Sequence, residues 1–158
     1  MHVRLGDVMV KLRLLSAGQR DEILAAQKTS GRPFGLLAER MFGVHPRQVE
    51  QAWAEQFAAS ADFVDPRTER TDPEVLALVE RRQAWQFRVL PLRLSGEDVL
   101  VCTTPQHIAR AMRFLGWRVG SPCCFVLAHP DHLGAALARH YPMAGLRAEH
   151  VGGLAAPA

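Results

Sequence analysis

The sequence has few cysteines, and none is spaced as in a disulfide framework or a zinc site. There are three, Cys102 and the adjacent pair Cys123 and Cys124, and no CxxC motif. Neighbouring residues on a strand point to opposite faces, so a disulfide between Cys123 and Cys124 is not expected. All three lie in apolar stretches, where a cysteine behaves as a small hydrophobic residue. This usage fits a reducing cytoplasm, and we predict no thiol chemistry.

Long apolar runs are also absent. No segment approaches the roughly 18 apolar residues of a membrane span. Charges at Arg4, Asp7, Lys11 and Arg13 interrupt the region where a signal peptide needs a hydrophobic stretch. The sequence therefore predicts a soluble, cytoplasmic protein without direct membrane insertion, which would reach the inner membrane only through a partner.

Motifs for nucleotide hydrolysis and nucleophilic catalysis are missing. There is no GxxxxGK[ST], no GxGxxG after a predicted strand, and no GxSxG. His129 and His132 flank Asp131, but the sequence places no third or fourth ligand for a metal there. A solvated turn entering a helix is the favoured interpretation of these histidines. We therefore predict no catalytic residue, no metal site, no cofactor and no enzymatic activity.

Neither positive nor negative charge is concentrated in any part of the sequence. The net charge is +3, and the 17 arginines and two lysines alternate with acidic residues, as in RDE at 20–22 and ER at 39–40. A nucleic-acid-binding surface would cluster the basic residues. Nucleic acid is therefore not a predicted partner.

What the sequence does contain is an internal repeat. The stretch RLGDVMVKLRLLS at 4–16 aligns with PFGLLAERMFGVH at 33–45, at an offset of 29 residues. The offset pairs four sets of identical residues: Gly6 with Gly35, Gln19 with Gln48, Ala25 with Ala54, and Gln27 with Gln56. Two amphipathic helices rarely agree this well, so we interpret residues 4–27 and 33–56 as a tandem duplication.

Helical spacing predicts a subdomain of four helices over residues 1–58. Leu5, Val8, Met9 and Leu12 share one helical face, and Ser16 with Gln19 forms a capping box that opens a second helix through Gln27. A third helix is expected over 34–41, and a fourth from Pro46 through Gln56. The result would be two helical hairpins in tandem.

A small α/β subdomain with a short mixed or antiparallel sheet is predicted over residues 73–142, giving an α+β fold. Residues 59–72 contain two Asp-Pro turns and a short strand at 63–64, and form a connector. Further expected elements are a helix over 73–86, a β-hairpin over 87–104, a helix over 105–115, a strand over 123–129 and a helix over 130–140. Trp85, Trp117 and Tyr141 are expected in the core. Residues 143–158 are expected to form a flexible tail.

The start of the repeat has two interpretations. Gly6 would let a ligand approach a helix start closely, and Arg4 could bind a phosphate or stack on a base. Two related copies would suit a ligand with two similar halves. Equally, Gly6 and Gly35 could allow close packing between helices, with Arg4 solvated. The residues themselves leave these two interpretations open.

The repeat and the elements after it resemble the N-terminal (GspE N-terminal or MshEN-type) domain of type II secretion and type IV pilus assembly ATPases. The resemblance rests on RLG, the apolar run, the serine before the second helix and the closing Gln, all repeated, and on FVDP at 63–66 and the segment 72–106. It covers residues 3–141. It implies a bacterial, non-catalytic regulatory or protein-docking module without the ATPase core, whose partner is a protein component of the secretion or pilus machine.

Some members of that family bind cyclic di-GMP across the two motifs, so a cyclic di-GMP receptor is the alternative function. Carried over by position, the resemblance implies ligand contacts from the following residues: Arg4, Leu5, Gly6, Gln27, Phe34, Gly35 and Gln56. Pro33 replaces the family's arginine in the second motif, with Arg32 one step away. The glycine after the apolar run is Arg13 in the first copy and Phe42 in the second. We therefore expect a degenerate second motif.

Overall fold

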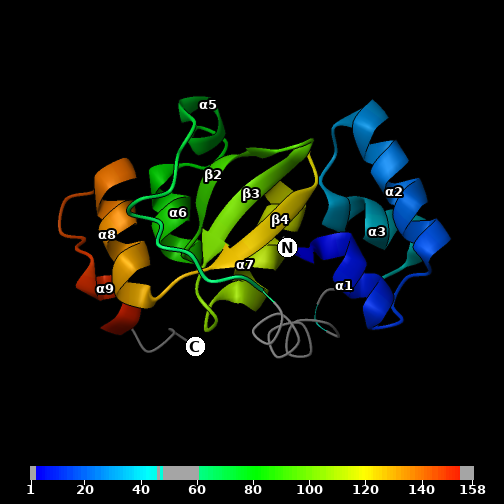
Figure 1. Cartoon of the computed structure of the whole chain (residues 1–158). Helices are drawn as coiled ribbons and strands as arrows, with labels where there is room; N and C mark the ends of the chain where they lie inside the picture. Colours follow the sequence, from blue (N-terminus) through cyan, green and yellow to red (C-terminus); the bar gives the residue numbers. More distant parts are fainter. Residues whose placement is uncertain (1–2, 46, 48–60, 154–158) are drawn as a thin grey trace.

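The structure, a computed structural model, describes residues 3–45, 47 and 61–153 and has an α+β fold. Figure 1 shows a sheet with α1–α3 at one end and α8 and α9 at the other. The helices are α1 (Leu5–Lys11), α2 (Ala17–Ser30), α3 (Phe34–Phe42), α5 (Pro73–Leu76), α6 (Arg81–Phe87), α7 (Ile108–Arg118), α8 (Pro130–His140) and α9 (Glu149–Gly153). The strands are β1 (Val3–Arg4), β2 (Leu90–Ser95), β3 (Asp98–Thr103) and β4 (Cys123–Leu127). The predicted fold class is confirmed.

The sheet is mixed, with the strand order β1-β4-β3-β2. β2 and β3 form the expected antiparallel hairpin, whose turn contains Gly96 at a φ of 65°. β3 and β4 are parallel and are connected through α7. Every residue of β3 and β4 is buried, as in strands covered on both faces.

Local sequence signals set the helical end of the molecule. Ser16 caps α2: its hydroxyl accepts from the Gln19 N–H at 3.1 Å, and the Gln19 side chain accepts from the Ser16 N–H at 2.8 Å. Gly31 ends α2 in the left-handed conformation, with a φ of 66°. The helices α1, α2 and α3 confirm three of the four predicted helices. The fourth, expected over 46–56, falls outside the described residues apart from Arg47.

The prediction that the first 58 residues are helical is wrong at the start of the chain. Val3 and Arg4 form β1, which pairs antiparallel with β4 through Val3–Phe125 and Arg4–Cys124. The sequence shows no strand here because two residues cannot display an alternating pattern. The buried apolar residues of both halves also form one core cluster. The division into subdomains therefore stays a prediction.

The helix predicted over 73–86 is two short helices. α5 ends at Leu76, whose carbonyl accepts a hydrogen bond from the Tyr141 hydroxyl at 2.6 Å. α6 starts after Glu80, which has an extended backbone and forms a capping box with Gln83. The turn between them buries Val79. A distant tertiary contact and a local cap together break the helix.

The short strand expected at 63–64 is reduced to an isolated bridge between Phe63 and Leu127.

The helix predicted over 105–115 is displaced: α7 begins at Ile108 and continues to Arg118. This extension brings Trp117 onto the surface, where 39% of it is exposed, so its assignment to the core is wrong. Trp85 and Tyr141 are buried as predicted, and the Trp85 indole N–H donates to the Tyr141 carbonyl at 2.7 Å. α8 spans 130–140 as expected.

The expectation of a flexible tail from residue 143 is wrong for the described part of that segment. α9 packs on α8 and buries Val151 completely. The two segments approach so closely that a Cβ on Gly134 would lie 2.0 Å from the Ala148 carbonyl oxygen. Arg88 also donates to the His150 carbonyl at 3.3 Å. Small residues in this segment serve close backbone packing.

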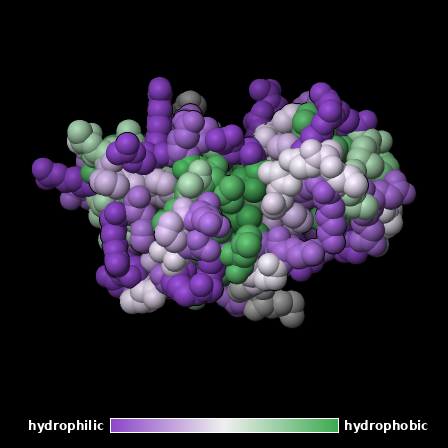
Figure 2. Space-filling model, turned by 90° about the horizontal axis from the view of Figure 1, so that it is seen from above, coloured by the Kyte–Doolittle hydropathy of each residue, from purple (hydrophilic) through white to green (hydrophobic). Residues whose placement is uncertain are grey.

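Apolar residues gather over the middle of the molecule when it is seen from above, while hydrophilic residues dominate much of the remaining surface (Figure 2). Across residues 3–45, 47 and 61–153, no helix is both long and apolar enough to cross a bilayer. The three cysteines in this part of the chain are all buried, and none forms a disulfide.

Candidate functional site

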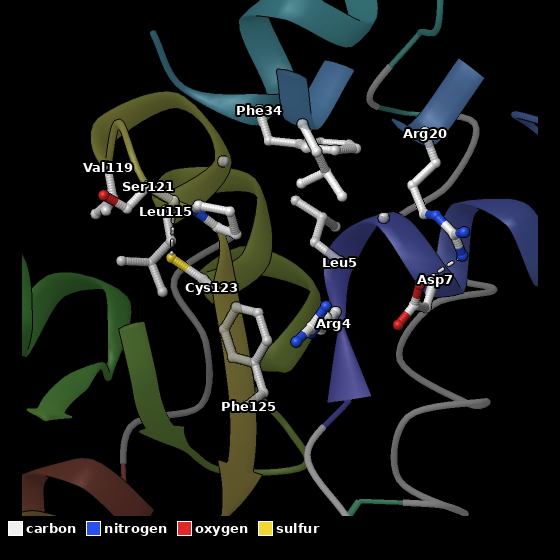
Figure 3. Close-up of a pocket in the computed structure, with 14 residues that line it drawn as sticks. Arg4, Leu5, Asp7, Arg20, Phe34, Leu115, Val119, Ser121, Cys123 and Phe125 are labelled. Atoms are coloured by element: carbon white, nitrogen blue, oxygen red, sulfur yellow. Dashed lines mark hydrogen bonds and ion pairs between the residues drawn. The ribbon is translucent and has the colours of Figure 1, made fainter. Parts of the chain in front are cut away.

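Four of the predicted ligand-binding residues meet at one recess. Arg4, Leu5 and Gly6 reach it from β1 and the start of α1, and Phe34 reaches it from the start of α3 (Figure 3). The remaining lining residues are Asp7, Arg20, Leu24, Leu115, Gly116, Val119, Ser121, Pro122, Cys123 and Phe125. The starts of the two repeat copies therefore face each other across one recess, and the second half of the chain completes its wall.

The recess is narrow. Its cavity volume is about 20 Å³, enough for about one water molecule. In Figure 3, Leu5 and Phe34 point toward each other across its mouth. A nucleobase is many times larger than a water molecule. Side chains at the recess, such as Phe34 and Arg20, would have to move before a base could enter.

Arg4 forms an ion pair that the sequence analysis did not anticipate. Its Nε lies 2.6 Å from Oδ2 of Asp98, the first residue of β3. The Asp98 side chain is only 8% exposed, whereas the Arg4 side chain is 54% exposed. One edge of the guanidinium is held, and the rest of the group remains accessible to solvent. Arg4 is thus positioned at the recess with spare hydrogen-bonding capacity.

Burial controls the ionisation of Asp98. Desolvation raises the pKa of its carboxyl above the ordinary value, and Arg4 opposes that rise by its charge and hydrogen bond. The negative charges of Asp7 and Glu97 push the pKa further upward. The carboxylate therefore depends on Arg4, its ion-pair partner, for stabilisation of its charge.

A second ion pair lies across the helical side of the recess. Arg20 on α2 contacts the carboxylate of Asp7 on α1 at 2.8 Å and that of Asp21 at 3.1 Å. These contacts raise the pKa of Arg20, with the Asp21 hydrogen bond as the largest cause. Since two carboxylates already hold Arg20, it is less available than Arg4 to an added anion.

Gly6 and Gly35 both lie where a side chain would collide with neighbouring elements. A Cβ on Gly6 would lie 2.9 Å from Arg20 Cγ and 3.2 Å from Phe34 Cζ. A Cβ on Gly35 would lie 3.1 Å from the Gly116 carbonyl oxygen on α7. This geometry supports the packing interpretation for both glycines. Gly6 also lines the recess. Its lack of a side chain therefore both allows close packing and keeps the recess open.

Gln27 lies beside the main recess. It is 2% exposed, and neither its amide nitrogen nor its amide oxygen has a hydrogen-bond partner among the residues that the structure describes. It lines a neighbouring surface hollow that shares Ser121 and Pro122 with the recess. A buried amide without partners is costly, by about 1–3 kcal/mol per unsatisfied group. Gly35 lines a third hollow with Leu5, and Gln56 lies outside the described residues.

Arg13 and Phe42 stand where the family pattern has a glycine after the apolar run, and their backbone conformations differ. Arg13 adopts a φ of 61°, in the left-handed region that favours glycine. In the second copy Phe42 is helical, and Gly43 takes the left-handed conformation instead, with a φ of 67°. The left-handed residue thus comes one position later in the second copy than in the first, and the first copy makes its turn with a strained arginine.

The other candidate groups show ordinary structural roles. His129 caps α8, since its Nδ1 accepts from the Asp131 N–H at 3.3 Å, as the turn interpretation predicts. Throughout the described segments, no three His, Cys, Asp or Glu side chains gather as metal ligands. Burial raises the pKa of each cysteine thiol, to about 11 for Cys124. Such thiols are poor nucleophiles at neutral pH.

Sequence reasoning missed the half of the site that comes from distant segments. The missed residues are Asp98 and those between Leu115 and Phe125 that line the recess. They lie about 90 to 120 residues from the start of the repeat, and no local motif connects them to it. The one available signal was the acidic residue placed directly after the Ser-Gly-Glu turn, where a strand start would bury it.

Three comparisons place the chain among known proteins. Residues 59–146 match the MshEN domain family, a range that leaves out the tandem repeat. A structure described as MshE with cdg shares 24% identity, covering 88% of this chain and 99% of that chain, with a TM-score of 0.47. Two crystal forms of the XpsE N-terminal domain share 18% and 19% identity. They cover 85% and 84% of this chain and 92% and 91% of those chains, with TM-scores of 0.46 and 0.41. No curated protein matches the chain.

Proposed function

The chain belongs to the MshEN domain family, and from this premise we propose that it is a non-catalytic regulatory or protein-docking module of a type II secretion or type IV pilus-like system. The family match, which spans more than half of the chain, is the observation that carries the proposal. Domains of this type precede a motor ATPase, as the sequence resemblance implies. The partner we propose is therefore a protein component of the machine.

The packing of the chain supports a docking role. One continuous core includes residues from α1 through α9, so surface side chains are presented from a fixed scaffold. Large apolar residues on that surface are Met41, Phe63, Leu78, Leu94 and Trp117. Aromatic and methionine side chains are enriched where proteins meet partners.

Affinity purification of the tagged chain from its native cells tests this function. We expect secretion or pilus components to be recovered well above the level of an unrelated tagged protein. As a folding control, Gly120→Ala is expected to destabilise the chain, because its Cβ would lie 2.0 Å from the Gly31 carbonyl oxygen, and to reduce recovery only in proportion to the chain that unfolds. Recovery of no such component by the wild-type chain would reject the docking function.

A cyclic di-GMP receptor is the second candidate, supported by the geometry around Arg4. The recess brings Arg4, Leu5, Gly6 and Phe34 together, and no described residue pairs with either amide atom of the nearby Gln27. A guanine base presents donors and acceptors that would satisfy such an amide, and the exposed part of Arg4 suits a phosphate. MshE has been described with cdg.

Isothermal titration calorimetry with cyclic di-GMP tests the receptor function. If Arg4 holds a phosphate, Arg4→Ala should weaken binding by about one to two orders of magnitude, the equivalent of about 1.5–3 kcal/mol for a charged hydrogen bond. Asp98→Asn keeps Arg4 and should retain binding. Pro33→Arg should strengthen it by restoring the family's arginine. No heat with the wild-type chain at high micromolar ligand would reject the receptor.

A further inference from the structure

The outward face of α7 carries an open groove that shares no lining residue with the recess around Arg4. Its cavity volume is about 620 Å³. Its lining consists of Phe87 from α6 and Arg110, Arg113, Phe114, Trp117 and Arg118 from α7. Three of the six are arginines and three are aromatic, and none of the described lining residues is acidic.

The helix places these residues together and holds them rigidly. Positions 110, 114, 117 and 118 are separated by four, three and one residues, so they share one face of α7. The opposite face contains Ile108, Ala111, Met112 and Leu115, all buried against the core. The groove is thus built on a helix that cannot rotate without exposing its apolar side.

The aromatic side chains are ordered before any partner binds. Phe87 stacks on Phe114 with ring centroids 4.1 Å apart and an interplanar angle of 7°. The Arg110 guanidinium lies over the Phe87 ring, 5.2 Å from its centroid. Trp117 continues this surface and is 39% exposed. A partner would meet a preformed apolar floor, which limits the entropy lost on binding.

The positive charge of the groove favours an acidic partner. Arg110 and Arg118 lie among described lining residues that include no acid. Burial lowers the pKa of Arg88, and the charge of Arg110 lowers it further. Such a surface repels basic segments and attracts carboxylates. Arginine and tryptophan are also the side chains that most often dominate binding energy at protein interfaces.

We propose that this α7 groove docks an acidic amphipathic segment of a protein partner, with an apolar side chain on Trp117 and carboxylates on Arg110 and Arg118. This inference rests on the docking function and names its surface. A protein segment fits better than nucleic acid, because Phe87 is already engaged by Phe114 and Arg110 and cannot stack on bases. α7, at 11 residues, is also only about 16 Å long.

Two groove variants and one matched control test the proposal in the native cell. Trp117→Ala removes the apolar contact, and Arg118→Gln removes one charge with little change in size. Arg139→Gln makes the same charge change at an exposed position of α8, outside the groove. All three should retain the wild-type unfolding temperature within a few degrees. The tagged chains are purified after crosslinking, the recovered secretion or pilus component is quantified, and its crosslinked segment is sequenced.

We expect Trp117→Ala to reduce recovery at least tenfold and Arg118→Gln several-fold, with recovery retained in Arg139→Gln and after nuclease treatment. The crosslinked segment should be rich in Asp and Glu, and higher salt should weaken the complex. Equal recovery by all variants would overturn the groove but leave the docking function standing. The groove proposal is also overturned if nuclease releases the partner, if the crosslink joins two copies of this chain, or if the segment lacks acids. Failure of the wild-type chain to recover any component would reject the docking function itself.

Discussion

Replacement of Arg4 by alanine is expected to destabilise the folded chain even without any ligand. The ion pair joins β1 to the start of β3, with Arg4 Nε 2.6 Å from Asp98 Oδ2. Arg4→Ala would leave the Asp98 carboxylate, which is 8% exposed, without its cationic partner. A buried charge without a partner costs more than the lost ion pair itself contributed.

The expected loss is about 1–2 kcal/mol in the free energy of unfolding at pH 7. Removing one partner of a fully buried pair costs about 3–5 kcal/mol. The Arg4 side chain is 54% exposed, so the attraction is partly screened by water and the figure must be reduced. Water that enters the space left by Arg4 would also solvate part of the carboxylate.

The loss should depend on pH, and its sign follows from the pKa of Asp98. Burial raises that pKa above the ordinary value of 3.8. In the window between 3.8 and the raised pKa, the folded chain binds a proton that the unfolded chain does not, so acidification favours the folded state. Arg4→Ala raises the pKa further and extends this window upward. The variant should therefore recover part of its lost stability as the pH falls through the window.

Urea unfolding followed by circular dichroism, at pH 7 and at pH 5, measures the effect. Asp98→Asn removes the titrating group, so the double variant Arg4→Ala/Asp98→Asn should be more stable than Arg4→Ala at pH 7. The reasoning is refuted if the double variant is no more stable than Arg4→Ala, or if the loss is the same at both pH values. The result also matters for ligand titrations, because it shows how much of an Arg4→Ala effect comes from the fold.

Three further predictions concern backbone strain, close packing and a buried histidine. Arg13→Gly is expected to raise the free energy of unfolding by about 0.5–1.5 kcal/mol, because an arginine at a φ of 61° is strained; a lower urea midpoint would contradict this. Gly120→Ala is expected to lower it by about 2–3 kcal/mol through the 2.0 Å approach to the Gly31 carbonyl, and an unchanged melting temperature would count against that contact. Burial lowers the pKa of His107 from 6.5 to about 4. The unfolded chain is protonated first, so stability should fall as the pH drops from 6.5 to 4. His107→Gln should flatten this part of the pH–stability profile, and an unaltered profile would disprove the assignment.

Local structure followed closely from local residues. The Ser16 capping box, the left-handed Gly31 and the turn at Gly96 each depend on groups within four residues of one another. Pro130 at the first turn of α8 is equally local. Such features are predictable because a cap or a turn satisfies its own hydrogen bonds and backbone angles.

Long-range pairing limited the prediction of the site. Arg4 and Gly6 were identified from the repeat, and the structure places both at the recess. Asp98 was not identified, although it holds the Arg4 guanidinium, because 94 positions separate the two residues. Trp117 was assigned to the core because a tryptophan is usually buried, and the sequence does not show where α7 ends.

By itself, the sequence indicated a tandem repeat and determined most helix starts and turns, the α+β class and the family resemblance, because periodicity, caps and spacing depend on residues close together in the chain. Only the tertiary structure decided that β1 joins the repeat to the sheet, that α9 packs on α8, and that Gly6 and Gly35 serve helix packing. It also placed an arginine and aromatic groove on the outer face of α7. These features depend on which distant segments pack together. Burial of apolar area stabilises that packing, but no single segment shows in its own sequence which partner it will contact.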